Sequence, residues 1–175
     1  MIDFLVNLLA IIVIGIVQIS FLPTWPAPVG GLNLILSLVI FLTASNYYKK
    51  GLWWAFGGGL FLDLFAIKLF GLSVISLLLT AVLINFLFKN FFTNYSFYSL
   101  TVLGVIGTMS YNLMILFFSF LFELLKSDDF WEFSLAGYIH NLWWQVILNL
   151  IIMYIVFFIF HLIGKNFRTN FLTSS

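Results

Sequence analysis

Residues 51–71 read GLWWAFGGGLFLDLFAIKLFG, and this stretch decides how the chain can fold. It is apolar enough to lie in lipid, yet it contains three consecutive glycines at 57–59 and an acidic residue, Asp63. A helix in lipid tolerates glycine, because each unpaired backbone group there costs several kcal/mol and the helical hydrogen bonds are kept. The stretch therefore predicts a membrane helix with a smooth surface for close packing and one buried acid.

The composition of the whole chain also indicates a protein that lies in lipid. Of its 175 residues, 63% are hydrophobic and 7% are charged, whereas soluble domains have about 45–50% and about 25%. The formal net charge of +1 excludes nucleic-acid binding by charge neutralisation. The absence of cysteine excludes disulfides and thiolate metal sites. We expect a single all-α domain, residues 1–175, that is a polytopic bundle of membrane helices.

Charges, prolines and glycine clusters divide the chain into about six apolar runs. A membrane helix needs about 20 residues to cross a hydrocarbon core of about 30 Å. The first break contains Pro23, Pro26 and Pro28, and such a segment cannot continue a helix. The predicted transmembrane helices cover roughly 4–22, 33–48, 52–67, 71–88, 97–122 and 143–163.

The positions of Lys and Arg predict the orientation, because cytoplasmic connections carry an excess of both. With the N-terminus in the cytoplasm, Lys68 and Lys126 lie outside and the other five of the seven basic residues lie inside. The five are Lys49, Lys50, Lys89, Lys165 and Arg168. We therefore expect both termini in the cytoplasm. The polar and aromatic segment 127–142 is expected to lie along the outer membrane surface.

The small residues of the opening stretch predict a packing seam. Lipid tails are as apolar as leucine, so membrane helices associate through close contact and polar bonds. Ala55 and Gly59 are four residues apart and share a helix face, which Gly57 and Gly58 widen. Asp63 follows Gly59 by another four residues and lies on the same face. We expect these five residues to pack against another helix, within the subunit or in a partner.

Asp63 lies deep in its predicted span, where an ionised side chain costs about 2.5–3.5 kcal/mol unless it is shielded. Proton relays use several acids or histidines, and Asp63 is the only acid deep within a predicted span. A structural, hydrogen-bonded acid is therefore favoured over coupling to transport. The candidate partners of its carboxylate are Lys68, Asn85, Asn112 and Asn149.

The sequence contains no recognisable catalytic constellation. His140 and His161 are too far apart for a local pair of metal ligands, and no Ser/His/Asp set or phosphate-binding loop is present. We expect a protein that is not an enzyme and that uses no cofactor.

The chain resembles the family of the rod shape-determining protein MreD over roughly residues 15–90. The first span ends in QISFLP at 18–23, and GGLFLDLF at 58–65 looks like the family's G-x-x-x-D-[LF] signature. LFG at 69–71 is similar to the family's turn into the next span. Leu32-Asn33 stands where the family often has Pro-Asp. The family-like positions are Gln18, Pro23, Asn33, Gly59, Asp63 and Gly71.

The resemblance implies a non-enzymatic scaffold in the bacterial cytoplasmic membrane. Members of the family associate with MreC, which has one membrane span and an extracytoplasmic domain. They help to couple cytoplasmic MreB filaments to peptidoglycan synthases. The spans of this chain would then form a docking surface for a partner helix.

An alternative is a small-solute-binding subunit that resembles the S-component of energy-coupling factor transporters, which has a similar size and six spans. Those proteins typically present an Ala-x-x-x-Ala patch on the first span, whereas here Ala10 is followed by Ile14 at the fourth position. A solute pocket also needs convergent polar groups. Only Asp63, Asn112 and the segment 138–145 could supply them.

Overall fold

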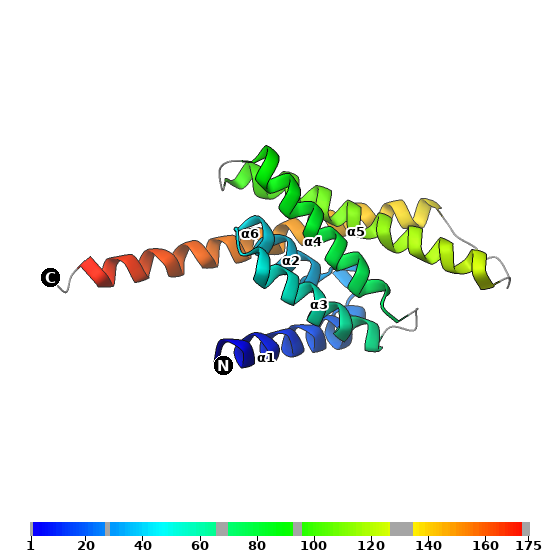
Figure 1. The fold of residues 1–175 in the computed structure, drawn as a ribbon, viewed down its shortest axis with the longest axis horizontal. Helices are drawn as coiled ribbons and strands as arrows, with labels where there is room; N and C mark the ends of the chain where they lie inside the picture. Colours follow the sequence, from blue (N-terminus) through cyan, green and yellow to red (C-terminus); the bar gives the residue numbers. More distant parts are fainter. Residues whose placement is uncertain (1, 27–28, 66–69, 93–95, 127–134, 173–175) are drawn as a thin grey trace.

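The computed structural model describes residues 2–26, 29–65, 70–92, 96–126 and 135–172, and every regular element in these ranges is helical. Consecutive α-helices run in alternating directions, so that α1 begins and α6 ends on the same side of the molecule (Figure 1). The α-helices are α1 (Ile2–Ile16), α2 (Leu34–Ala44), α3 (Tyr48–Phe65), α4 (Leu72–Phe91), α5 (Phe97–Lys126) and α6 (Leu135–Leu172).

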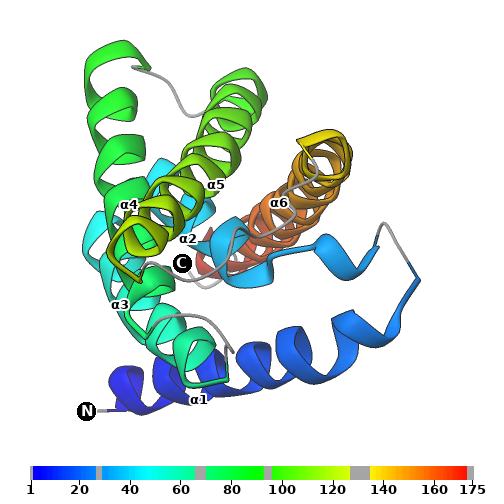
Figure 2. The same ribbon diagram turned by 90° about the vertical axis from the view of Figure 1, so that its right-hand side faces the viewer.

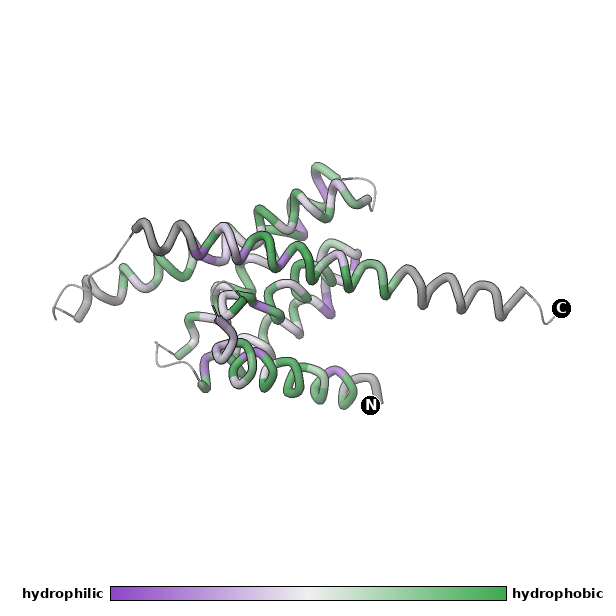
Figure 3. Tube along the Cα trace, turned by 180° about the vertical axis from the view of Figure 1, so that it is seen from behind, coloured by the Kyte–Doolittle hydropathy of each residue, from purple (hydrophilic) through white to green (hydrophobic). Residues whose placement is uncertain are grey.

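Within the described residues, four segments are long and apolar enough to cross a membrane by length and composition. Their mean hydropathies lie between 1.7 and 2.6, and Figure 3 shows apolar residues along most of α1. The segments are Leu5–Thr24, Leu72–Phe91, Phe97–Leu121 and Asn141–Phe160. These helices indicate an all-helical membrane protein, as the composition predicts.

The observed helices differ from the six predicted spans chiefly at residues 33–48 and 52–67. α2 has 11 residues, which is about 16 Å of helix and about half of a hydrocarbon core. α3 has 18 residues, and its first turn includes Lys49 and Lys50. In the part of the chain that the structure describes, four segments therefore meet the length and composition requirement, where the sequence predicts six spans.

The predicted outer segment, residues 127–142, divides into two parts. Residues 127–134 lie outside the described residues, and residues 135–142 form the first turns of α6. α6 also continues past residue 163 to Leu172, so it is 38 residues long, longer than the predicted span 143–163.

Short helical turns connect α1 to α2. α1 continues as a π-helix over Val17–Phe21 and then as a 3-10 helix over Leu22–Thr24, and a second 3-10 helix covers Val29–Gly31. Pro23 lies in the first turn of Leu22–Thr24, where a helix does not need the missing N–H. The chain then turns back, and α2 begins inside the bundle after Asn33, which is 6% exposed.

α2 lies at the centre of the bundle. Eight of its eleven residues are buried, and it contacts all five other α-helices. Figure 2 shows α2 between α3 and α6. Ile35 and Ile40 are fully buried, and the ring of Phe41 lies 5.5 Å from that of Phe160 on α6. The longer helices therefore surround a short helix that could not cross a membrane by its own length.

Candidate functional site

The three consecutive glycines of α3, at 57–59, contact three different helices. A Cβ on the first would lie 3.2 Å from Ile11 of α1, and a Cβ on the second would lie 2.5 Å from Ile35 of α2. A Cβ on the third would lie 2.7 Å from the backbone Cα of Val74 in α4. Successive residues of an α-helix point about 100° apart, so three adjacent glycines allow α3 to approach three neighbours. Ala55, one turn earlier, is fully buried as well.

Asp63 lies one turn after Gly59 and holds the start of α4. Its side chain is 3% exposed and accepts three backbone N–H bonds. The donors are Gly71 at 3.0 Å, Ser73 at 2.9 Å and Val74 at 3.1 Å. The first N–H groups of a helix have no partners within the helix, and their partial positive charge favours a carboxylate. Asp63 is therefore a cap for the helix that follows its own.

Gly71 makes this arrangement possible at the turn. Its φ of 95° lies in the left-handed region, which glycine adopts without the steric cost of a Cβ. The backbone N–H of Gly71 thereby points toward the Asp63 carboxylate together with the first N–H groups of α4.

Among the described residues, the partners of the Asp63 carboxylate are backbone amides and not the side chains that the sequence suggests. Asn112 and Asn149 form hydrogen bonds elsewhere, and Asn85 lies about 20 Å along α4 from the capped end. Lys68 lies outside the described residues. A helix start supplies several unpaired donors at one place, and their partial positive charge favours a carboxylate.

A second cluster of polar residues surrounds the start of α2. Asn149 of α6 accepts the backbone N–H of Asn33 at 3.1 Å through its Oδ1. The Oδ1 of Asn33 accepts the N–H of Leu36 at 2.9 Å and the Nε2 of Gln18 at 3.1 Å. The Oε1 of Gln18 accepts the N–H of Ile35 at 3.0 Å. Side chains from two other elements thus satisfy N–H groups that α2 leaves unpaired inside the bundle.

Gln18 reaches α2 from the π-helix over Val17–Phe21. A π-turn changes the direction of side chains relative to the preceding α-helix and is frequent at functional sites. Here the π-helix contains Gln18, whose carboxamide connects the end of α1 to the start of α2.

A row of three polar pairs joins the antiparallel helices α5 and α6. The pairs are Thr101 with Tyr154 at 2.6 Å, Thr108 with Asn149 at 3.4 Å, and Asn112 with Gln145 at 2.9 Å. Because lipid provides no hydrophobic force between helices, such bonds contribute directly to helix association. Asn149 belongs both to this row and to the cluster at α2, so it connects three helices.

The structure brings the family-like residues together in two places. Gln18 and Asn33 are bonded to each other, and Gly59, Asp63 and Gly71 lie at the α3–α4 junction. Pro23 is exposed in the connection after α1 and belongs to neither place.

Thr108 was not among the residues singled out from the sequence, and Gln145 was included only as part of the segment 138–145. A signal was present, because Thr108 precedes Asn112 by four residues and Gln145 precedes Asn149 by four. Such spacing places two polar side chains on one face of an apolar helix. Their pairing across α5 and α6 could be seen only in three dimensions.

Within the described part of the chain, no group of three His, Cys, Asp or Glu residues is arranged to hold a metal ion. Comparison with known proteins matches no family model, no curated protein and no solved structure.

Proposed function

We propose that the chain is a non-enzymatic scaffold of the bacterial cell-elongation machinery, similar to the rod shape-determining protein MreD. The placement of the family-like residues carries the proposal. Gln18 and Asn33 form one joint between successive helices, and Gly59, Asp63 and Gly71 form another. A platform for other proteins requires helices held in fixed relative positions, and both joints provide this.

The proposed location is the bacterial cytoplasmic membrane, crossed six times with both termini in the cytoplasm. The alternating directions of α1 to α6 and the common side of the chain ends support this topology (Figure 1). In it, residues 29–44 form the second crossing and α3 forms the third. The distribution of Lys and Arg supports the orientation.

The proposed partners are a single-span protein similar to MreC and, through it, MreB-like filaments and peptidoglycan synthases. α1 is a suitable docking surface for the helix of a single-span protein. Only 11% of its apolar window is buried, against 39% for the window of α4. Leu9 and Val13 lie on an exposed face of α1.

The test is purification of the full chain in mild detergent, followed by mass spectrometry of the proteins that accompany it. We expect a single-span protein with an extracytoplasmic domain. Replacing Leu9 and Val13 by Trp should remove that protein by steric obstruction of α1. The matched control replaces Leu113 and Phe117, which are exposed on α5, and should retain it. Recovery of a pair of ATPases instead of a single-span partner would overturn the proposal.

A second function, binding of a small solute, has one observation in its favour. Asn112 and Gln145 are half-buried and bonded to each other, next to the polar cluster at α2. Amide groups in such a position could bind a polar solute. The same purification separates the two functions, because a solute-binding subunit would carry a small molecule that Asn112→Leu releases.

A further inference from the structure

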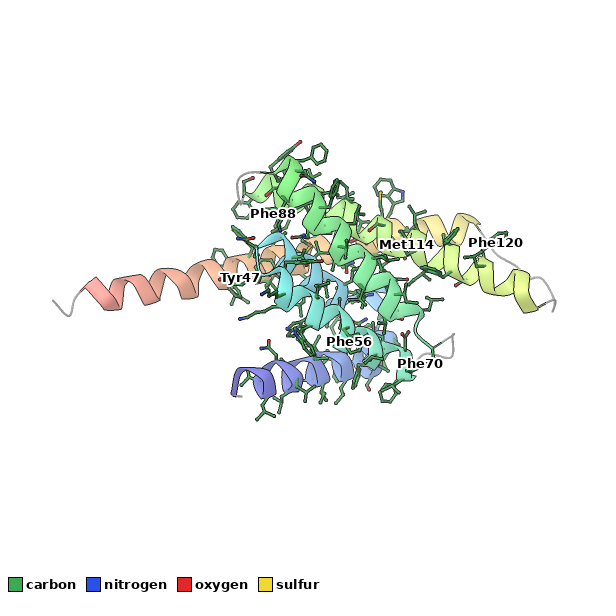
Figure 4. The ribbon with its side chains drawn as sticks, viewed as in Figure 1. Tyr47, Phe56, Phe70, Phe88, Met114 and Phe120 are labelled. Atoms are coloured by element: carbon green, nitrogen blue, oxygen red, sulfur yellow. The ribbon has the colours of Figure 1, made fainter. Side chains whose placement is uncertain are left out.

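One end of the bundle carries exposed lysines next to exposed aromatic side chains. At this end α2 and α4 finish, and α3 and α5 begin (Figure 1). Figure 4 places Tyr47 and Phe88 there, and Phe70 and Phe120 toward the opposite end. The feature does not depend on the proposed function.

On α3, Lys49 and Lys50 are exposed in the first turn. Trp53 follows Lys49 by four residues, so both lie on one face, and the indole is 63% exposed. The ammonium group of Lys50 lies 5.5 Å from the centre of the Tyr47 ring, which is within cation–π distance. The lysines of α3 therefore lie one turn closer to the end of the bundle than an exposed aromatic side chain.

α4 repeats this arrangement in the opposite chain direction. Lys89 is exposed in its last turn. Phe86, three residues earlier and on the same face, is 57% exposed. On both helices a basic residue thus lies about one turn closer to this end of the bundle than an exposed aromatic residue on the same face.

Acidic residues are scarce near these lysines. Between residues 4 and 122 the only acid is Asp63, which is buried at the other end of α3 with both carboxylate oxygens bonded. Among the side chains that the structure describes, this end carries Lys49, Lys50 and Lys89 and no acidic residue. The positive charge therefore exceeds the negative charge at this end.

We infer that this basic–aromatic rim binds the headgroups of anionic phospholipids. The rim consists of Tyr47, Lys49, Lys50, Trp53, Phe86 and Lys89. Exposed Trp and Tyr side chains, here Trp53 and Tyr47, prefer the boundary between acyl chains and headgroups. A lysine one turn beyond that boundary reaches the lipid phosphates with its ammonium group while its stem stays in the apolar layer. The aromatic side chains favour a lipid over an acidic soluble protein, because they place the lysines at the depth of the phosphates.

The experiment compares binding of phosphatidylglycerol and phosphatidylcholine to the full chain in detergent, with native mass spectrometry to count retained lipids. Each lysine near an anionic surface contributes about fivefold to affinity. The variant with Lys49, Lys50 and Lys89 all replaced by Gln should therefore need at least about tenfold more phosphatidylglycerol for the same occupancy. Its retention of phosphatidylcholine should stay unchanged.

Two controls make the result specific. Lys126→Gln removes a lysine from the end of α5 at the opposite end of the bundle, and should bind phosphatidylglycerol like the unmodified chain. Replacing the three rim lysines by Arg keeps the charge and should also preserve binding. Inorganic phosphate at millimolar concentration should not displace the lipid, because it lacks the acyl chains that hold the headgroup at the rim.

Several outcomes would overturn the inference. They are equal retention of the two lipids by the unmodified chain, unchanged retention in the triple Gln variant, an equal loss in Lys126→Gln, and displacement by inorganic phosphate. If the triple Gln variant loses its helical circular dichroism, it is misfolded and its lipid retention is not informative. The salt dependence of lipid retention by the unmodified chain then tests the inference. Retention of phosphatidylglycerol should fall between 50 and 500 mM salt, and retention that is insensitive to salt would reject the inference.

Discussion

The carboxylate of Asp63 accepts the backbone N–H of Ser73 at 2.9 Å, so an acid near the end of α3 caps the helix that follows it. Gly59, one turn earlier, lies against the backbone of α4 at Val74. The two features depend on each other. Aspartate has a short side chain, and it reaches the start of α4 because the glycine lets the two backbones come close. The combination of glycine and acid in one apolar stretch is explained by this junction.

Replacing Asp63 by Asn should destabilise the chain by about 1.5–3 kcal/mol, the range for hydrogen bonds to charged groups. The carboxylate uses both oxygens to accept three N–H groups, whereas an amide NH₂ cannot accept. At least one backbone donor would lose its partner. Thermal unfolding in detergent measures the change. Leu64→Ala, at a neighbouring position that is 67% exposed, should have little effect, and equal stability of Asp63→Asn and the unmodified chain would contradict the cap.

Gly59→Ala should cost about 1–3 kcal/mol, the usual range for overpacking. The added Cβ would lie 2.7 Å from the Cα of Val74, and backbone cannot rotate away as a side chain can. Gly31→Ala is the matched control, because a Cβ there meets nothing within 4 Å. Unfolding of both variants in the same detergent gives the comparison. Similar stabilities of the two variants would show that the backbones of α3 and α4 are not in close contact at Gly59.

Asn149→Leu should cost about 1–3 kcal/mol, because the buried backbone N–H of Asn33 would lose its acceptor. A double-mutant cycle with Gln18→Leu tests whether the cluster at the start of α2 acts as a unit. We expect a coupling of at least about 0.5 kcal/mol, since both side chains bond to the same short segment. Additive effects would indicate that the two amides stabilise α2 independently.

Single introduced cysteines can report the topology directly, because the chain contains no cysteine of its own. With six crossings and both termini in the cytoplasm, Asn46→Cys should react with a membrane-impermeant maleimide only from the cytoplasmic side. Thr24→Cys should react only from the outer side. Both positions are exposed, so access to the reagent depends on the membrane. Labelling of Asn46→Cys from the outer side would reject this topology.

A row of bonds between α5 and α6 gives a further prediction. Tyr154→Phe removes the hydroxyl that lies 2.6 Å from the Thr101 hydroxyl. Polar bonds between membrane helices contribute about 0.6 kcal/mol on average, so this variant should be only slightly less stable than the unmodified chain. Thr101→Val should then lower the stability less in the Tyr154→Phe background than in the unmodified chain. Full additivity of the two changes would show that the hydroxyl pair contributes nothing.

The sequence by itself determined the solvent, the helical class and the importance of residues 57–63. Apolar residues make up most of the chain, and a helix is the structure that satisfies its own backbone in lipid. Glycine and a lone acid within such a helix indicate close packing and shielding, whichever neighbour provides them. Gln18 and Asn33 were marked only by the resemblance to the MreD family.

Only the tertiary structure decided which neighbours these are and how long each helix is. The backbone N–H of Asn33 meets a side chain 116 positions away in the sequence, and local patterns carry no information on such a contact. α2 has 11 residues instead of a full span because the chain before it turns back into the bundle. There, side chains of the π-helix Val17–Phe21 and of α6 complete its hydrogen bonds. Among the described residues, the partner of Asp63 is the start of the next helix, because the unpaired N–H groups there come within reach of the carboxylate only when α3 and α4 pack together.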